Sequence, residues 1–185
     1  FALGSGHHLF HNLLDGVGPL TEEMIRQHLS GDVILETYVQ RSNGTSKYVV
    51  FDIDISKKIL LQYDYGSLEF NAHKQNAAEH ASKLCKILQR MGMIGYIEDS
   101  GFRGYHVWVF FTGWIPVRYI NRFTECVQKE LGDSGDGITM EVFPNSARIR
   151  AGKFGQKIRL PLGVHIRTGN RSYFVDVQLR PITDY

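Results

Sequence analysis

The segment 48–56 constrains this chain most, because an apolar, β-branched run there carries two carboxylates, Asp52 and Asp54. Alternate side chains of a strand point to the same face, so these two acids should project together. Neighbouring carboxylates on a buried strand repel each other and lose hydration. A divalent cation would relieve both costs, and oxygen-only ligands suit Mg²⁺ or Mn²⁺. The alternative is a strand end at which both acids meet solvent.

The length and composition indicate one domain with a sizeable core, since the chain has 185 residues and 43% hydrophobic content. We expect a flexible lead-in over residues 1–18, which are rich in Gly and His, and a single folded domain over residues 19–185. No apolar run approaches the ~20 residues that a membrane span needs. Cys85 and Cys126 lack metal-ligand spacing, so we predict reduced, core-facing thiols in a cytoplasmic protein without a zinc site.

Periodicity and turn signals predict an alternation of helices and strands. The dipeptide Asn43-Gly44 is the strongest hairpin signal, so the strands on either side of it are expected to pair antiparallel. His73 and His80 are expected at the surface, at the edge of a helix or off its apolar stripe. The expected helices cover residues 19–29, 73–91 and 116–131, the expected strands cover 33–39, 48–56, 93–97, 107–111, 138–143 and 172–179, and residues 57–72 are expected to be irregular.

A glycine-rich turn, Asp99–His106, lies between two of the predicted strands. Glycines let backbone amides approach a phosphate closely, and a serine hydroxyl and an arginine add donors. His106 opens the second strand, where a histidine is usually a hydrogen-bonded core residue. Its place just after the pattern Ser-Gly-x-x-Gly favours a phosphate contact instead.

A third acid, Glu141, lies in the apolar run 138–143. A buried carboxylate without a partner is costly, so Glu141 needs one. Joining Asp52 and Asp54 around a metal ion would supply that partner, and a salt bridge to a basic neighbour is the alternative.

The stretch 142–175 contains no Asp or Glu, although the net charge of the whole chain is only +2. Its cations are interleaved with aromatic residues and follow the candidate metal site, so that binding to a polyanion and a merely solvated basic face are both open interpretations. The cations of this basic stretch are Arg148, Arg150, Lys153, Lys157, Arg159, Arg167 and Arg171.

Three separated segments resemble the three motifs of the archaeo-eukaryotic primase superfamily. Asp52-Ile53-Asp54 resembles its metal-binding first motif. Ser100–His106 resembles the second, whose histidine contacts the phosphates of the incoming nucleotide, and Met140-Glu141 resembles the third, whose acid completes the metal site. The segment 157–162 resembles the downstream basic segment that grips the triphosphate, and His165 falls where relatives often carry another basic residue.

The resemblance covers about residues 20–180 and implies both a fold and an activity. The fold is α/β, with a mixed, mostly antiparallel sheet like that of RNA-recognition motifs, flanking helices and an N-terminal αβ extension. The implied activity is template-dependent nucleotidyl transfer from nucleoside triphosphates, which makes and extends primers on single-stranded DNA and releases pyrophosphate. The domain over residues 19–185 would therefore be a catalytic primase-polymerase domain.

The resemblance also assigns roles to residues. Asp52, Asp54 and Glu141 would be catalytic and hold one or two Mg²⁺ or Mn²⁺ ions. The residues that bind the nucleotide would be Ser100, Gly101, Arg103, Gly104, His106, Lys157, Arg159 and His165. The residues that contact the template would be Arg148, Arg150, Lys153, Arg167 and Arg171.

Two departures from the family pattern and several alternatives stay open. Glu141 replaces the more usual Asp of the third motif, and Gly104 stands where some members have Ser. The compact form looks most like CRISPR-associated primase-polymerases of prokaryotes, which would make CRISPR adaptation proteins its partners. A metal-dependent nuclease or phosphodiesterase and a non-catalytic single-strand nucleic-acid-binding module are the rival functions. No sugar-selecting residue is identifiable, and the candidates are Tyr63, Tyr65 and Tyr173.

Overall fold

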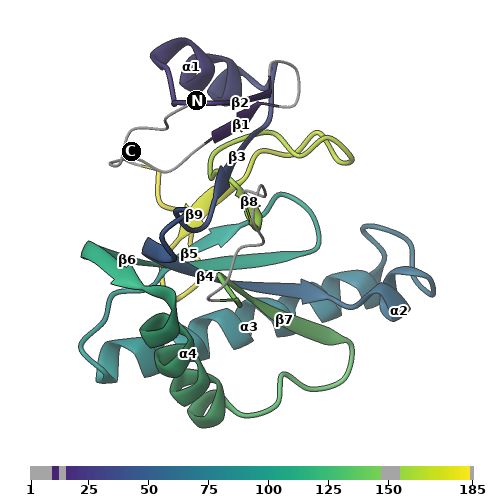
Figure 1. The fold of residues 1–185 in the computed structure, drawn as a ribbon. Helices are drawn as coiled ribbons and strands as arrows, with labels where there is room; N and C mark the ends of the chain where they lie inside the picture. The colour runs from purple at the N-terminus through teal and green to yellow at the C-terminus, as the bar shows by residue number, and fades with distance from the viewer. Residues whose placement is uncertain (1–9, 13–15, 147–154, 184–185) are drawn as a thin grey trace.

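The computed structural model describes residues 10–12, 16–146 and 155–183. Its larger sheet has five antiparallel strands in the order β7-β4-β6-β5-β9, and two long helices cover one face of it (Figure 1). The elements of this layer are β4 (Thr45–Ile55), α2 (Lys57–Leu60), α3 (Leu68–Arg90), β5 (Tyr96–Asp99), β6 (Gly104–Pro116), α4 (Val117–Leu131), β7 (Ile138–Phe143) and β9 (Tyr173–Val175).

The smaller sheet has the strand order β2-β1-β3-β8 and lies on the side of the larger sheet opposite α3 and α4 (Figure 1). Its strands are antiparallel and short, and α1 contacts β3. The elements of this layer are β1 (Phe10–Asn12), β2 (Gly16–Gly18), α1 (Glu22–Ser30), β3 (Leu35–Tyr38) and β8 (Lys157–Arg159). The architecture is therefore the mixed α/β arrangement of antiparallel sheets with flanking helices that the sequence predicts.

Alternate side chains of β4 point to opposite faces of the larger sheet and serve different roles. Val49, Phe51 and Ile53 are fully buried and pack against the apolar stripe of α3 and α4. This burial of apolar side chains is the main stabilising contribution to the larger sheet. On the other face, Tyr48 and Val50 join a second cluster that fixes the smaller sheet in place. Asp52 and Asp54 follow on that same face, beyond the end of this cluster.

The register of the larger sheet aligns four polar side chains in one row. Asp52 pairs with Glu141 on β7 and with His106 on β6, and His106 in turn pairs with Glu98 on β5. Residues directly opposite each other in antiparallel strands lie on the same face of the sheet. The row Glu141, Asp52, His106 and Glu98 therefore crosses four strands on the face that the helices leave open.

The predicted hairpin between the strands at 33–39 and 48–56 is wrong. The turn itself forms, with the Gly44 amide donating to the Arg41 carbonyl over 2.9 Å. The strands diverge on either side of it, because β3 pairs with β1 and β8 while β4 pairs with β6 and β7. The turn signal is local, whereas the partner of each strand is set by which apolar faces meet in the core.

Other predicted boundaries and exposures differ from the structure. Residues 57–72 are not irregular throughout, because they contain α2 and the first turn of α3, whose N-terminus is capped by the Ser67 hydroxyl. Cys85 is buried as predicted, but Cys126 is exposed on α4. His80 is buried rather than at the surface. Among the described residues, no helix is long and apolar enough to cross a membrane.

Part of the segment predicted as a flexible lead-in is paired. Strands β1 and β2 lie within residues 10–18 and extend the smaller sheet next to β3. The boundary between a lead-in and a domain that begins at residue 19 stays a prediction.

Candidate active site

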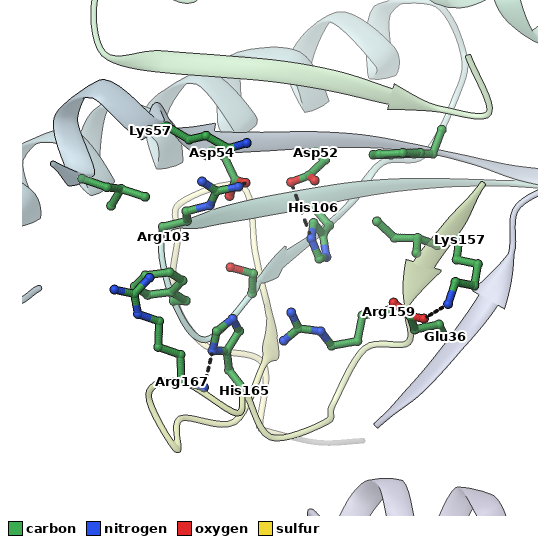
Figure 2. A pocket seen from close by; sticks show the side chains of 15 residues that line it. Glu36, Asp52, Asp54, Lys57, Arg103, His106, Lys157, Arg159, His165 and Arg167 are labelled. Atoms are coloured by element: carbon green, nitrogen blue, oxygen red, sulfur yellow. Dashed lines mark hydrogen bonds and ion pairs between the residues drawn. The ribbon is translucent and has the colours of Figure 1, made fainter. Parts of the chain in front are cut away.

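A pocket of about 500 Å³ opens between the two sheets (Figure 2). The larger sheet contributes Asp52 and Asp54 from β4 and His106 from β6, and the smaller sheet contributes β8 and Glu36 of β3. The lining residues are Glu36, Asp52, Asp54, Lys57, Leu60, Ser100, Phe102, Arg103, His106, Phe143, Lys157, Ile158, Arg159, His165 and Arg167. The pocket therefore combines two neighbouring carboxylates with a surround of cations.

The two carboxylates on β4 lie side by side, and the environment of Asp54 disfavours its charged form. Burial, followed by the charge of Asp52, raises the pKa of Asp54 from 3.8 to about 6, although Arg103 and His106 act in the opposite direction. Arg103 forms an ion pair with Asp54 at 2.5 Å. Asp52 Oδ1 is buried and has no hydrogen-bond partner among the described residues. The site thus holds an unsatisfied carboxylate oxygen beside a carboxyl group that resists ionisation.

Glu141 does not lie as the sequence predicts. Its backbone is directly opposite Asp52 in the register, but its side chain is exposed, so the prediction that Glu141 is a buried acid in need of a partner is wrong. The reason is that β7 is the edge strand of the sheet, where a side chain reaches solvent easily. Glu141 is also not one of the described residues that line the pocket.

The donor set fits a hard divalent cation. Mg²⁺ is commonly held by one or two carboxylates together with substrate phosphates and water, and Asp52 and Asp54 supply two carboxylates side by side. Within the described ranges, no three His, Cys, Asp or Glu side chains are grouped closely enough to hold a metal ion. Asp52 and Asp54 therefore fit Mg²⁺ or Mn²⁺, and Glu141 as a third ligand stays a prediction.

His106 is held between two acids. Its Nδ1–H donates to Glu98 Oε2 over 2.9 Å, and its Nε2 lies 3.6 Å from Asp52 Oδ1. Burial opposes a charge on the ring, but the Glu98 carboxylate and the hydrogen bond to it, with Asp52 and Asp54, raise the pKa of His106 to about 9. At neutral pH the ring is therefore an imidazolium whose Nε2–H faces the pocket.

The glycine-rich turn is fixed by its own hydrogen bonds. Asp99 Oδ1 accepts a hydrogen bond from the Gly101 amide at 2.8 Å and also binds Lys74. Gly101 has a φ of +79°, and a Cβ there would lie 2.8 Å from the Asn170 carbonyl oxygen. Gly104 lies opposite Asp54 in the register, with no room for a Cβ. The structure thus explains both glycines by local geometry, and their contacts to a phosphate stay predictions.

The cations around the pocket differ in how they are engaged. Arg103 is paired with Asp54, and Lys157 is paired with Glu36. No acid within 4.0 Å of Arg159 or Lys57 is found among the described residues, although both line the pocket. A polyanion entering the pocket would give these two cations the counter-charge that the described protein atoms do not supply.

His165 is a neutral donor rather than a further charge. Burial, together with Arg159, Arg167 and Arg103, lowers the pKa of His165 to about 4. Its Nδ1 accepts a hydrogen bond from the Arg167 amide over 3.2 Å, so its proton is on Nε2. A neutral Nε2–H among arginines suits a hydrogen bond to a ligand oxygen.

Most residues predicted to bind a nucleotide meet at this pocket. Ser100, Arg103, His106, Lys157, Arg159 and His165 all line it, together with Asp52 and Asp54. Arg167, predicted to contact the template, lines it as well. Arg171 is exposed and donates to the Leu162 carbonyl. The predicted template contacts Arg148, Arg150 and Lys153 lie outside the described residues.

Sequence reasoning missed three residues of the site. Lys57 is the first residue of α2, just after the strand that carries the aspartates, and Glu36 lies in a strand whose partner was predicted wrongly. Glu98 lies behind His106 and is almost fully buried. The sequence places Glu98 two residues after Tyr96 in a predicted strand, so the two side chains share one face. Only the register of the sheet shows that Glu98 on this face lies opposite His106.

The raised pKa of Asp54 predicts how the stability of the metal-free protein changes with pH. Between pH 4 and 6 the unfolded chain ionises this group while the folded chain keeps its proton, so the free energy of unfolding falls as pH rises. Relative to an Asp54→Asn variant, the metal-free wild type should lose stability as pH rises through this window and stay level above it. Urea unfolding of both proteins in chelator at several pH values measures this, and a difference independent of pH would contradict it.

Comparisons with known proteins agree with this fold. The family model described as "TOTE conflict system, Archaeo-Eukaryotic Primase domain" matches residues 14–185. The chain is also similar in structure to the polymerase domain of Mycobacterium tuberculosis Ligase D in complex with DNA, with a TM-score of 0.54 and 12% identity over 78% of this chain. The match spans about half of that structure, 52%. Curated proteins give no match.

These comparisons confirm the resemblance to primases, while the CRISPR-associated subtype stays a prediction, since the matching model describes a conflict-system domain. The match begins before the first motif and ends after the last strand, so it includes every residue of the pocket. The chain belongs to the archaeo-eukaryotic primase family.

Proposed function

We propose that this chain catalyses template-dependent nucleotidyl transfer from nucleoside triphosphates and that it makes and extends primers on single-stranded DNA. The observation that carries the proposal is the composition of one pocket. Two adjacent carboxylates, Asp52 and Asp54, share it with Arg103, Arg159 and other cations. A nucleoside triphosphate needs cations for its phosphates, and the carboxylates fit the divalent ion that accompanies it.

The residues of the pocket have different roles in the proposed reaction. A bound Mg²⁺ or Mn²⁺ ion supplies the means to lower the pKa of an attacking 3′-hydroxyl and to neutralise charge on the triphosphate. Asp52 and Asp54 would hold it. Arg159 and Lys57 bind triphosphate oxygens, and His106 donates its Nε2–H to one of them. These contacts hold the α-phosphate in line with the attacking hydroxyl. Such positioning, together with stabilisation of charge, supplies most of the rate enhancement in phosphoryl transfer.

A nucleic-acid template is the second partner that we propose. The Ligase D polymerase domain, which shares this fold, was solved in complex with DNA. The basic stretch beyond β7 supplies cations that would follow a phosphate backbone without reading sequence. We assign Arg171, Arg148, Arg150 and Lys153 to the template and move Arg167 to the nucleotide, since it lines the pocket.

The decisive experiment supplies single-stranded DNA, Mn²⁺ and labelled nucleoside triphosphates, with and without a primer, beside an Asp52→Asn control. Metal-dependent products without a primer would support priming, and products only with a primer would restrict the activity to extension. Shortened DNA without synthesis would favour a nuclease. DNA binding that survives chelator, with no reaction, would favour the non-catalytic module. A cytoplasmic location and CRISPR adaptation partners belong to this proposal only as predictions.

A further inference from the structure

Glu98 is a buried acid that the proposed chemistry does not yet use. The residue is 1% exposed, and it lies on β5 behind the pocket rather than in its lining. A buried carboxylate is costly unless it is hydrogen-bonded, so an acid at this position needs a reason that an apolar side chain would not satisfy. The partners of the carboxylate give that reason.

In the part of the chain that the structure describes, the hydrogen bonds to the Glu98 carboxylate come from β6. Trp108 Nε1–H donates to Oε2 over 2.8 Å, and His106 Nδ1–H donates to the same oxygen over 2.9 Å. Trp108 is itself buried at 2% exposure and packed in the core cluster between the sheets. One buried carboxylate oxygen therefore accepts hydrogen bonds from both rings, and its bond to the imidazole holds His106 in place.

This anchoring determines which nitrogen of His106 faces the pocket. Because Nδ1 is engaged by an acceptor-only group, it carries a hydrogen and points away from the pocket. Nε2 then points toward Asp52 Oδ1, at 3.6 Å, which is too long for a hydrogen bond and leaves Nε2–H available to a ligand. A ring flipped by 180° would lose the Glu98 contact.

We propose that Glu98 is a positioning residue, which fixes the His106 ring so that Nε2–H meets a phosphate oxygen of the incoming nucleoside triphosphate. This inference rests on the proposed function, because it requires a phosphate in the pocket. Glu98 acts only through His106 and does not itself touch the nucleotide. Its arrangement resembles the carboxylate that orients a metal-bound histidine, here with a phosphate in place of the metal.

A double-mutant cycle tests this role. Glu98→Ala should weaken nucleotide binding about tenfold, which is the effect of losing one charge-assisted hydrogen bond, and should raise KM more than it lowers kcat. His106→Ala should weaken it at least as much, and the double variant should be no worse than His106→Ala alone. A general structural effect of Glu98 would instead weaken the double variant further, and that result would overturn the proposal.

Two matched variants sharpen the cycle. Glu98→Gln keeps an acceptor oxygen for His106 and should recover most of the affinity that Glu98→Ala loses. Trp108→Phe removes the other donor and leaves His106 with its partner, so it should stay within about threefold of the wild type. Equal losses in all three variants would overturn the proposal in favour of a packing defect.

Two further readouts separate this inference from the proposed function. Calorimetric titration of the wild type with a non-hydrolysable nucleoside triphosphate and Mn²⁺ should show binding, and its absence would overturn both proposals. Binding by Glu98→Ala as tight as that of the wild type would overturn only the role of Glu98. Proton–nitrogen NMR of the histidine rings should show a hydrogen-bonded His106 Nδ1–H in the wild type that Glu98→Ala loses, and this requires no activity.

Discussion

Replacing Asp52 with asparagine is expected to reduce nucleotidyl transfer about a thousandfold or more while the protein stays folded. Asparagine keeps the shape of the side chain but removes the charge that a divalent ion and its bound triphosphate require. The folded state should not suffer, because the substitution relieves the repulsion between Asp52 and Asp54 that helps to raise the pKa of Asp54. In the absence of metal, the melting temperature should be unchanged or higher.

Single-turnover primer extension with Mn²⁺, beside a thermal melt, measures both parts of this prediction. Glu36→Gln is the matched control, since it removes one negative charge from the same pocket without changing the pair on β4. It disturbs the ion pair with Lys157 and should cost about tenfold or less. Comparable losses in the two variants would point to the net charge of the pocket, and near-normal extension by Asp52→Asn would remove the metal assignment.

Gly104→Ala is expected to destabilise the fold by about 3 kcal/mol and to disrupt the site at the same time. A Cβ at this position would lie 2.1 Å from the Ile53 carbonyl oxygen and 2.4 Å from Asp54 Oδ1. Moving either neighbour costs free energy, because the Ile53 carbonyl is backbone of the central strand and the Asp54 carboxylate is held by Arg103. The strand pair β4 and β6 must separate locally, which moves Asp54 relative to Asp52.

Gly113→Ala provides the matched control within the same strand. A Cβ at Gly113 would meet nothing within 4 Å, so this variant should unfold within about 0.5 kcal/mol of the wild type. Guanidinium unfolding of the two variants gives the comparison directly. Similar unfolding free energies for both would show that β6 can shift at Gly104 without cost, and would contradict the close approach that the structure describes.

The sequence predicted which side chains share a strand face better than it predicted the connections between strands. Asp52 and Asp54 share a face because the period of a strand is fixed by local geometry, and the structure confirms that both enter one pocket with His106. The partner of β3 was predicted wrongly, since Lys157 on β8 is remote in sequence and no local pattern links it to Glu36. The exposure of Glu141 depends on β7 being an edge, which is a property of the whole sheet.

The role of the buried acid Glu98 also could not be predicted from the sequence. Glu98 carries no motif, and its role follows only from the pairing of β5 with β6, which brings it to His106. Lys57 likewise reaches the pocket from the start of α2, which no periodic pattern of the sequence links to the site. Sequence reasoning therefore finds the chemical groups that share a strand, and it misses those that the tertiary arrangement adds to them.

The two-sheet construction also has a consequence for the order in which the chain folds. The pair of Lys157 with Glu36 joins positions 121 residues apart, whereas β4, β6 and the helices between them are closer in sequence. Contacts between remote segments carry a larger loop-closure entropy and tend to form late. We therefore expect the newly made chain to bring Asp52, Asp54 and His106 together before Arg159 and Lys157 of β8 join them, so that an intermediate lacking β8 would be folded around β4 but would hold only part of its triphosphate site.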